Sequence, residues 1–450
     1  MIYLLLSGYN QLIHRYMKHP APSGLVQMLI TNPLYFFLLP ALLCIFCQPS
    51  SAQDIEKYVT QYTVSIRSVA PDSAGYSDLE AFGNAIGDAR IVMLGEQDHG
   101  DAPAFLAKTR LIRYLHEKKG FTVLAFEADF FGLNNGWDQA DKNNPYFFLQ
   151  ANIFPLWTFC DACNYLFRSY IPQTQQTADP LQVSGFDDQM VLQFSKSFLT
   201  KKLDSVLRSH NLPVTHDPDY ESKIIPLVDS CRRTSLSKES LFDEQRNYLL
   251  RIKEELGKAI PPNDFWMLVV DNLIAESNQH RSAKNDGSQI SFRDEQMAQN
   301  LLWLATVKYA GKKIIVWAQN GHVAKPGNFN DSWQDNIHYM GRVFDGIKPP
   351  SLKTYVLGFT SYEGEAGRIG TKTFDVMKPK KNAFESWVPD SMNYAFTDFT
   401  SFRNTNPGVD VNFRLKGLGH TYLHKGSAWH RIFDGIFFIR KMYPCNQGSR

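Results

Sequence analysis

A glutamate and a histidine stand three positions apart, directly after an apolar run at residues 91–94. They are Glu96 and His99 in the segment GEQDHG, residues 95–100. A nearby carboxylate orients an imidazole through one ring nitrogen, and the dipole of the helix expected after Asp101 disfavours the charged imidazolium. A neutral, oriented ring is suited to act as a general base on water. The alternative is that the two residues form only a solvated pair on a loop.

Other apolar runs also lead into polar ends. The run at 123–126 is followed by Glu127 and Asp129, that at 181–186 by Asp187, Asp188 and Gln189, that at 312–317 by Gln319, Asn320 and His322, and that at 354–359 by Thr360, Ser361 and an acidic loop at 363–365. Ligands of open parallel sheets bind at the carboxyl ends of the strands. Glu96, His99, Glu127, Asp187 and His322 are therefore the strongest titratable candidates for one active site.

Arg293 is a further candidate, and it stands between Asp187 and His322 in the sequence. Ser291 to Asp294 has the form of a capping box before a long helix, so we expect Arg293 in the first turn of that helix. There it either faces the site or pairs with an acid elsewhere.

The elements that must position these residues alternate between strands and helices. The first strand is expected to start at Arg90, a helix to run from an N-cap at Asp101 to Gly120, and a last strand to cover 432–439. Such alternation predicts an α/β fold with a largely parallel sheet flanked by helices.

The length of 450 residues predicts two or three domains, or one large domain with an insertion. We expect residues 53–189 and 291–450 to form two parts of one α/β domain. Residues 190–290 hold amphipathic helices separated by prolines and are expected to form an inserted helical subdomain. Its role is either a cap over a pocket or simple scaffolding.

The segment after Asp129 is rich in aromatic residues and asparagine. Trp137, Phe147 and Trp157 either line a pocket for an apolar ligand or pack in the core under a long loop.

The N-terminal 52 residues are expected to be a targeting segment that is not part of the fold. An apolar run at 33–47 precedes a small-residue segment before Gln53, which predicts a cleaved signal peptide and an exported protein, periplasmic or secreted. The true start is Met17 or Met28 if the first residues are not translated, and an uncleaved membrane anchor is the alternative. Export would leave Cys160, Cys163, Cys231 and Cys445, with Cys160 and Cys163 as a structural disulfide or two buried thiols.

Composition and absent motifs narrow the chemistry. With 47 basic and 45 acidic residues and no basic stripe, nucleic acid is not expected as a partner. The sequence has no Gly-x-Ser-x-Gly elbow, no nucleotide-binding glycine loop and no His-Glu-x-x-His. These absences favour a hydrolase that uses His-activated water, with no cofactor and no metal. A metal held by the two histidines and the carboxylates is the alternative.

Several segments together resemble the erythromycin esterase family. In order they are GEQDHG, LIRYLHEKKGF, VLAFEAD, GFDDQ, FRDEQMAQN, WAQNGHVA, the Met340-Gly341 pair and DGIFFI, spread over about residues 85–440. The resemblance implies hydrolytic opening of macrolide lactones without a metal, through a histidine that activates water.

Carried over by position, the resemblance makes His99 the base and Glu96 and Glu127 the acidic residues of the site. Arg293 and His322 would stabilise the oxyanion or protonate the leaving alkoxide, and Asp187 and Gln319 would contact the substrate. One residue departs from the family pattern Trp-Ala-His-Asn-x-His, because Gln319 replaces its first histidine and cannot carry a proton.

The resemblance therefore implies an ester or lactone substrate, with macrolides and a response to antibiotic among the expectations. The competing hypothesis is a non-catalytic exported protein that binds a small ligand, and a metal or haem binder is the third. Contact with a membrane is expected only through an uncleaved N-terminal segment.

Overall fold

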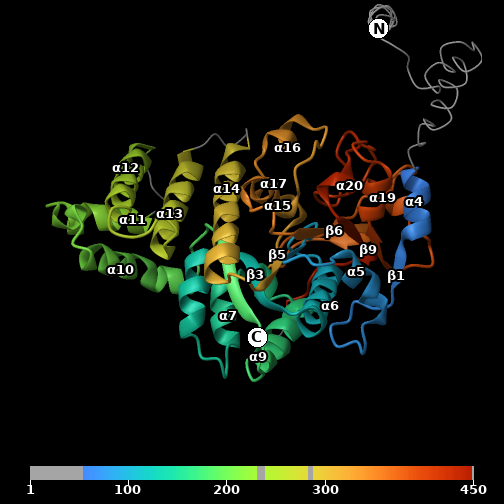
Figure 1. Ribbon diagram of the computed structural model, residues 1–450, viewed down its shortest axis with the longest axis horizontal. Helices are drawn as coiled ribbons and strands as arrows, with labels where there is room; N and C mark the ends of the chain where they lie inside the picture. The colour runs from blue at the N-terminus through green and yellow to red at the C-terminus, as the bar shows by residue number, and fades with distance from the viewer. Residues whose placement is uncertain (1–53, 231–238, 282–286, 448–450) are drawn as a thin grey trace, which may run out of the picture. The chain divides into compact units, whose positions relative to one another are not determined.

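The structure is a computed structural model that describes residues 54–230, 239–281 and 287–447 (Figure 1). The expected signal peptide and Cys231 lie outside these ranges. Residues 53–450 form one compact unit by their contacts. No helix within the described ranges is both long enough and apolar enough to cross a membrane.

The described residues form a nine-stranded sheet with the order β1-β8-β9-β6-β2-β5-β3-β4, and β7 pairs with β6 outside this path. The strands are β1 (Val64–Ile66), β2 (Ile91–Leu94), β3 (Phe121–Asp129), β4 (Gln182–Asp187), β5 (Lys313–Trp317), β6 (Thr354–Ala366), β7 (Phe374–Asp375), β8 (Tyr394–Asp398) and β9 (Gly435–Met442). The run from β9 to β4 is parallel throughout, while β8 is antiparallel to both of its neighbours. The predicted largely parallel α/β sheet is confirmed.

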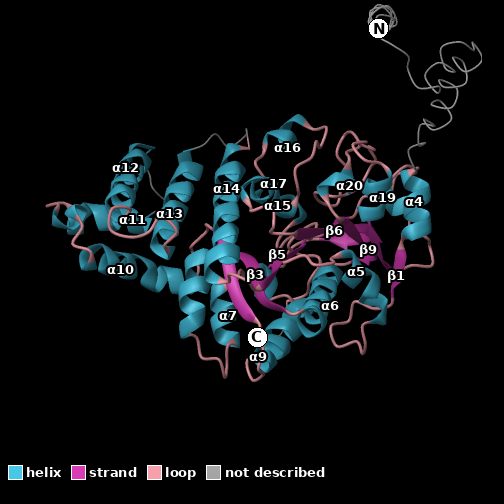
Figure 2. Cartoon of the chain, in the orientation of Figure 1, coloured by secondary structure: helices cyan, strands magenta, loops and turns pink. Residues whose placement is uncertain are grey.

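Helices cover both faces of this sheet, with α6 and α9 on one side and α14, α17 and α20 on the other (Figure 2). The α-helices are α4 (Ile55–Tyr62), α5 (Glu80–Ala85), α6 (Ala102–Lys119), α7 (Tyr146–Asn152), α8 (Pro155–Thr158), α9 (Ile171–Thr174), α10 (Gln193–Ser209), α11 (Ile225–Ser230), α12 (Glu239–Leu256), α13 (Phe265–Arg281), α14 (Ser288–Trp303), α15 (Asn320–Val323), α16 (Ser332–Asn336), α17 (Met340–Ile347), α18 (Phe384–Trp387), α19 (Thr400–Thr405) and α20 (Trp429–Ile432). Short 3-10 or π segments are η1 (Ser77–Leu79), η2 (Gly132–Gly136), η3 (Trp137–Gln139), η4 (Asp161–Cys163), η5 (Tyr165–Tyr170), η6 (Pro213–His216), η7 (Tyr220–Ile224) and η8 (Leu304–Lys308).

Strand β2 shows why the central strands are apolar on both faces. Val92 and Leu94 belong to the core cluster that includes Phe105 of α6, whereas Ile91 and Met93 belong to the cluster that includes residues of α14 and α17. Because side chains alternate across a strand, a strand covered by helices on both faces must be apolar throughout. All four residues of β2 are buried.

Four predicted boundaries are wrong. The last strand is β9, at Gly435–Met442, rather than a strand over 432–439. The first strand is β1, at Val64–Ile66, rather than a strand from Arg90. β6 continues through the predicted acidic loop because Glu363 and Gly364 pair with β9. Helix α14 begins at Ser288, with Gly287 before it at φ 80°, so Arg293 lies beyond the first turn.

Asp101 precedes α6 as predicted, but its side chain does not cap the helix. One oxygen accepts a hydrogen bond from the Asp98 backbone N–H at 3.0 Å, and the other lies 2.9 Å from His420 Nε2. Gly120 ends α6 as predicted, with φ 73° and its N–H bonded to the Leu115 carbonyl.

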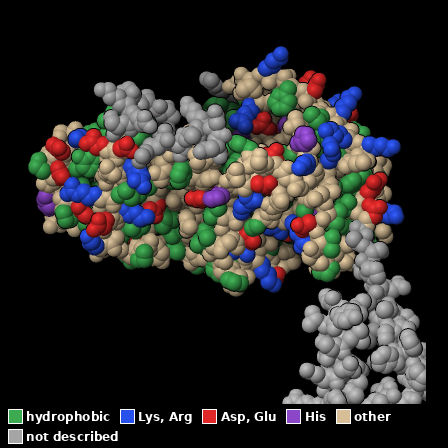
Figure 3. Space-filling model, turned by 90° about the horizontal axis from the view of Figure 1, so that it is seen from above, with side chains coloured by type: hydrophobic (Ala, Val, Ile, Leu, Met, Phe, Trp, Pro, Cys, Tyr) green, Lys and Arg blue, Asp and Glu red, His purple; other side chains and the backbone are tan. Residues whose placement is uncertain are grey.

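The described residues from α10 to α13 form mainly helices, which pack on a cluster of buried apolar residues that includes Leu203, Leu249 and Leu273. Phe130 and Phe131, which follow β3, belong to the same cluster. The expected subdomain boundaries at 190 and 290 stay a prediction. On the face seen in Figure 3, basic and acidic side chains are interspersed over the described surface.

Candidate active site

The loop between β2 and α6 packs too closely on its neighbours to tolerate side chains at its two glycines. A Cβ on Gly95 would lie 2.0 Å from Asn320 Oδ1, and one on Gly100 would lie 2.1 Å from the Gly367 carbonyl oxygen. Both approaches are shorter than any real contact, which explains why glycine brackets the segment GEQDHG. The loop therefore packs closely against α15 and against the residue that follows β6, and it holds Glu96 and His99 at the carboxyl end of β2.

Glu96 is fully buried and binds three nitrogen groups. Its Oε1 lies 2.8 Å from His99 Nδ1 and accepts a hydrogen bond from Trp157 Nε1 at 3.1 Å. Its Oε2 accepts from Lys108 Nζ at 2.5 Å. The His99 side chain is 12% exposed, and its Nε2 lies 3.9 Å from Glu127 Oε1, beyond hydrogen-bond distance.

Glu127, at the carboxyl end of β3, is the centre of the site. Its Oε1 accepts from Arg293 Nη2 at 2.9 Å and lies 3.2 Å from His322 Nε2. Its Oε2 accepts from the Gln319 backbone N–H at 3.0 Å. Burial alone raises the pKa of Glu127, but His322, followed by His99 and Arg293, outweighs it and holds the pKa well below its usual range.

Arg293 joins the end of β4 to this centre. Its Nε and Nη2 donate to the two carboxylate oxygens of Asp187 at 2.9 and 2.7 Å. This fork geometry fixes the guanidinium plane. Burial lowers the pKa of Arg293, but Asp187 and Glu127 outweigh it and raise the pKa well above its usual range.

His322, in α15 after β5, is held at both nitrogens. Its Nδ1 lies 2.8 Å from Asp294 Oδ2, which also accepts from the Met340 backbone N–H at 2.8 Å. Burial lowers the pKa of His322, but Asp294 and Glu127 outweigh it and raise the pKa to about 10. The ring is therefore an imidazolium at neutral pH. Its Nε2–H and the Arg293 Nη1–H group, 3.1 Å apart, do not bond each other.

The structure thus brings six of the predicted residues into one polar cluster: Glu96, His99, Glu127, Asp187, Arg293 and His322. Gln319 touches the cluster through its backbone N–H, whereas its side chain donates to the Gln97 carbonyl at 3.2 Å. The catalytic and substrate-binding roles of these residues stay predictions.

Sequence reasoning missed two members of the cluster. Lys108 is buried on α6 and contacts Glu96, and Asp294 was interpreted only as a helix-capping residue. Lys108 shares a helical face with the buried residues Phe105, Ile112 and Leu115. A lysine on an apolar stripe was the signal that could have found it.

The two interpretations of the aromatic segment both apply in part. Trp137 and Trp157 are buried, as core packing predicts, while Phe147 is 66% exposed. Trp157 also reaches the site, because it bonds Glu96 and its ring meets His99 edge to face at 5.3 Å.

A second carboxylate–histidine pair, Asp101 and His420, involves the same loop, because Asp101 lies at its end. His420 lies between Asp101, 2.9 Å from its Nε2, and Ser361, whose Oγ is 3.4 Å from Nδ1. The residue types are those of a nucleophilic triad. Ser361 and Asp101 are fully buried, so this group holds the loop against β6 and presents no nucleophile to a substrate.

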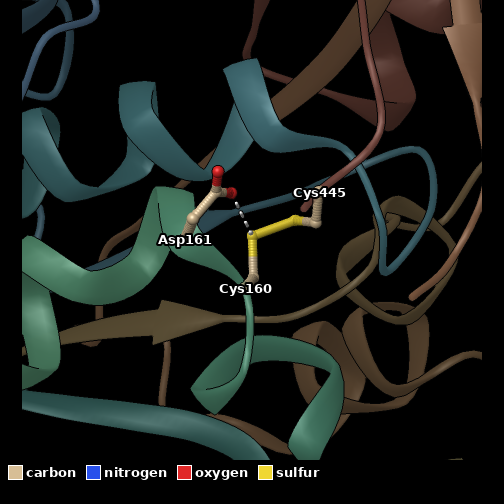
Figure 4. Close-up of side chains that lie close together, drawn as sticks. All are labelled: Cys160, Asp161 and Cys445. Carbon is tan, nitrogen blue, oxygen red and sulfur yellow. Dashed lines mark hydrogen bonds between the residues drawn. A yellow bond between two sulfur atoms is a disulfide. The ribbon is translucent and has the colours of Figure 1, made fainter. Parts of the chain in front are cut away.

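The prediction that Cys160 and Cys163 form a disulfide or are two buried thiols is wrong, because Cys160 has another partner. Cys160 is joined to Cys445 by a disulfide (Figure 4). Cys163 is a buried free thiol. With Asp161, the two bonded cysteines are the one group in the described ranges whose metal-type ligand atoms lie within 4.8 Å of one another. Disulfide sulfurs are not thiolates, so this group does not fit a metal ion.

A model of the erythromycin esterase family matches residues 116–442. The chain therefore belongs to the erythromycin esterase family, which supports a role as a hydrolase of the esterase type. The matched span contains Glu127, Asp187, Arg293 and His322 and begins after Glu96 and His99.

Individual relatives are distant but cover most of the chain. YbfO of Bacillus subtilis (strain 168), which is named as a hydrolase, is 26% identical over 83% of this chain and 88% of its own. The Escherichia coli protein named erythromycin esterase type II is 23% identical over 86% and 97%.

Two solved structures share the fold. A succinoglycan biosynthesis protein superposes with a TM-score of 0.65 at 20% identity, over 89% of this chain and 99% of its own. A mutant of the erythromycin esterase EreC in its open conformation gives 0.62 at 15% identity, over 86% and 100%.

Proposed function

We propose that the protein is a carboxylic ester hydrolase in which His99 activates a water molecule for attack on an ester or lactone carbonyl. The observation that carries the proposal is the asymmetry of the His99 ring. Nδ1 is bound to the buried Glu96 at 2.8 Å, while Nε2 has its nearest carboxylate 3.9 Å away. With the ring proton on Nδ1, Nε2 offers a lone pair to a water.

Glu127 supplies the second contact for that water. One water molecule can donate one hydrogen to His99 Nε2 and the other to Glu127 Oε1, since both acceptors lie within 3.9 Å of each other. Such a water has its oxygen lone pairs free for the carbonyl carbon. His99 takes up the proton as the C–O bond forms, and Glu96 stabilises the resulting imidazolium.

Arg293 and His322 are the cations of the proposed mechanism. Both lie against Glu127 and carry positive charge at neutral pH, so they can stabilise the oxyanion of the tetrahedral intermediate. His322 can also donate its Nε2 proton to the leaving alkoxide. Asp187 holds Arg293 in place, and we propose that Asp187 and Gln319 border the bound substrate.

Family membership supports an ester as the substrate class, and the name of the Escherichia coli relative makes macrolide lactones the first ones to test. Gln319 stands where the family motif has a histidine, so the proposed mechanism uses no proton transfer at this position. It also uses no metal.

The deciding experiment measures hydrolysis of small esters and of macrolides by the purified mature protein, with and without a chelator. We expect chelator-resistant turnover that falls about 10²–10⁴-fold in His99→Gln. His216→Gln, at an exposed histidine far along the chain, is the matched control and should retain full activity. Folded wild-type protein that turns over no ester would refute the proposal and favour a non-catalytic binding protein.

We also propose that the protein is exported. The apolar run at 33–47 supports a signal peptide, and the Cys160–Cys445 disulfide is of the kind that persists in oxidising compartments. Expression with the native N-terminus should give a processed protein outside the cytoplasm, with the mass of a chain that starts near Gln53. An unprocessed chain in the cytoplasm with reduced Cys160 and Cys445 would contradict export.

A further inference from the structure

One charged side chain of the cluster has no part in the proposed reaction. Lys108 of α6 is fully buried, and its Nζ donates to Glu96 Oε2 at 2.5 Å and to the Ala318 carbonyl at 3.3 Å. The ammonium also lies 4.1 Å from the centre of the Trp317 ring. Burying an ammonium is costly unless a partner of opposite charge is held with it. Glu96 is that partner, and it is also the partner of His99.

The contacts of Glu96 divide between its two oxygens. Oε1 meets Trp157 Nε1 and His99 Nδ1, and Oε2 meets Lys108 Nζ. Three nitrogens on two elements and one loop therefore fix the carboxylate plane. Lys108 and Trp157 bind Glu96, whereas Glu127 is bound by Arg293, His322 and the Gln319 backbone.

We propose that Lys108 is a positioning residue that keeps Glu96 ionised and aimed, so that neutral His99 carries its proton on Nδ1 and presents the Nε2 lone pair. The proposal rests on the proposed function of His99 as the base. Lys108 touches no substrate and transfers no proton in it.

The charges of this buried group balance only while Lys108 is an ammonium. With an ammonium on Glu96, the group of Lys108, Glu96 and neutral His99 has no net charge. Without the ammonium, Glu96 and His99 share one uncompensated negative charge in a buried site, and the pair takes up a proton more readily. If that proton sits on His99, the ring is an imidazolium; if it sits on Glu96, the carboxyl donates to Nδ1 and the ring proton moves to Nε2. Either way Nε2 carries a proton and is no base.

Other charged or titratable groups surround the pair and remain unchanged in the variants below. They are Glu127 of β3, Cys163 of η4, Asp98 and Asp101 of the same loop, Arg368 bound to Asp98, and Arg293 and His322 beyond Glu127. Of these, Cys163 has its pKa raised well above its usual range by burial and stays a neutral thiol.

The test compares the pH dependence of kcat/KM for wild type and Lys108→Met, whose side chain keeps the length of the stem without the charge. We expect the acidic limb of the profile to move to higher pH by about one unit or more, with activity approaching wild type on the alkaline side. A purely structural lysine would lower Tm and leave the limb in place, which would overturn the proposal. Lys108→Met with Glu96→Gln removes both charges and should show no such shift.

A second measurement does not depend on activity. In protein with 15N-labelled histidine, NMR reports which nitrogen of neutral His99 carries the proton, and the His99 signals are those missing in His99→Gln. We expect the Nδ1–H form in wild type, and an imidazolium or Nε2–H form in Lys108→Met at the same pH. Nε2–H in wild type, or Nδ1–H in both, would overturn the proposal. If wild type hydrolyses no ester, the proposed function fails, and the NMR result still decides the role of Lys108.

Discussion

Two histidines turn their Nε2 atoms toward the same oxygen of Glu127, and the difference between them bears on which ring carries the extra proton. Each has its Nδ1 2.8 Å from a buried carboxylate, Glu96 for His99 and Asp294 for His322. Lys108 balances the charge of Glu96, whereas Asp294 contacts a backbone N–H and His322 itself. His322 therefore supplies the positive charge that Asp294 needs.

The Nε2 atoms complete the contrast. That of His322 lies 3.2 Å from Glu127 Oε1, and that of His99 lies 3.9 Å from the same atom. The same carboxylate–imidazole pair thus gives a locked cation on one side and, in our proposal, an open base on the other. Two differences separate them: His322 lies closer to Glu127, and in our proposal Lys108 already neutralises the carboxylate that binds His99.

Removing the negative charge of Glu127, which both histidines approach, should have the largest effect. In Glu127→Gln one oxygen becomes an NH₂ group, and both oxygens now accept from N–H groups, so either orientation of the amide sets donor against donor. We expect kcat to fall about 10³-fold, roughly 4 kcal/mol.

Glu295→Gln on the same helix as Arg293 is the control, because Glu295 pairs with the exposed His338 away from the cluster. It should leave kcat unchanged. A Glu127→Gln enzyme within threefold of wild type would place Glu127 outside the mechanism.

Asp294→Asn should lower the pKa of His322 toward that of an ordinary histidine. The amide oxygen can still accept from His322 and from the Met340 N–H, but the larger of the two negative charges that raise the pKa of His322 to about 10 is gone. We expect kcat above pH 8 to fall about 10²-fold, roughly 2.7 kcal/mol, with near-normal activity at pH 6. The pH profile of kcat checks this. A loss that is the same at every pH would mean that Asp294 acts only through packing.

The fold was predictable where a strand is buried on both faces. β2, β3 and β5 appear in the sequence as short apolar runs, because helices cover each of them on both sides. β1 has three residues with mixed burial and gives no such run. The extension of β6 depends on its pairing with β9, which the local polar sequence does not reveal.

The site residues that follow strands directly were predictable from the sequence. Glu96, Glu127 and Asp187 meet because the carboxyl ends of parallel strands share one edge of the sheet. Lys108 reaches the site from a helix, where a lysine is normally taken for a surface residue. The bond between Cys160 and Cys445 spans 285 positions, and no local spacing indicates it.

The raised pKa of His322 should also make the stability of the protein depend on pH. The pKa of His322 is about 10 in the folded protein against 6.5 for an unperturbed histidine, so the folded state holds this proton more tightly. Its contribution is complete below pH 6.5, declines as pH rises and is lost through pH 10.

Urea unfolding at pH 7, 8 and 9 measures this decline. Because one pKa unit corresponds to about 1.36 kcal/mol, we expect the free energy of unfolding to fall about 2 kcal/mol more in wild type than in His322→Gln between pH 7 and 9. Parallel curves for the two proteins would show that His322 is not an imidazolium in the folded state.

The smallest expected effect comes from placing a third histidine in the site, at position 319. Gln319 bonds Glu127 through its backbone N–H, and only the bond to the Gln97 carbonyl depends on its side chain. Gln319→His, which restores the residue of the family motif, should therefore change kcat/KM on esters less than about fivefold, under 1 kcal/mol. Gln319→Ala is the matched control for losing the side-chain bond. If histidine raised the rate tenfold or more while alanine did not, a proton transfer at position 319 would be limiting, and the two histidines would no longer account for the chemistry alone.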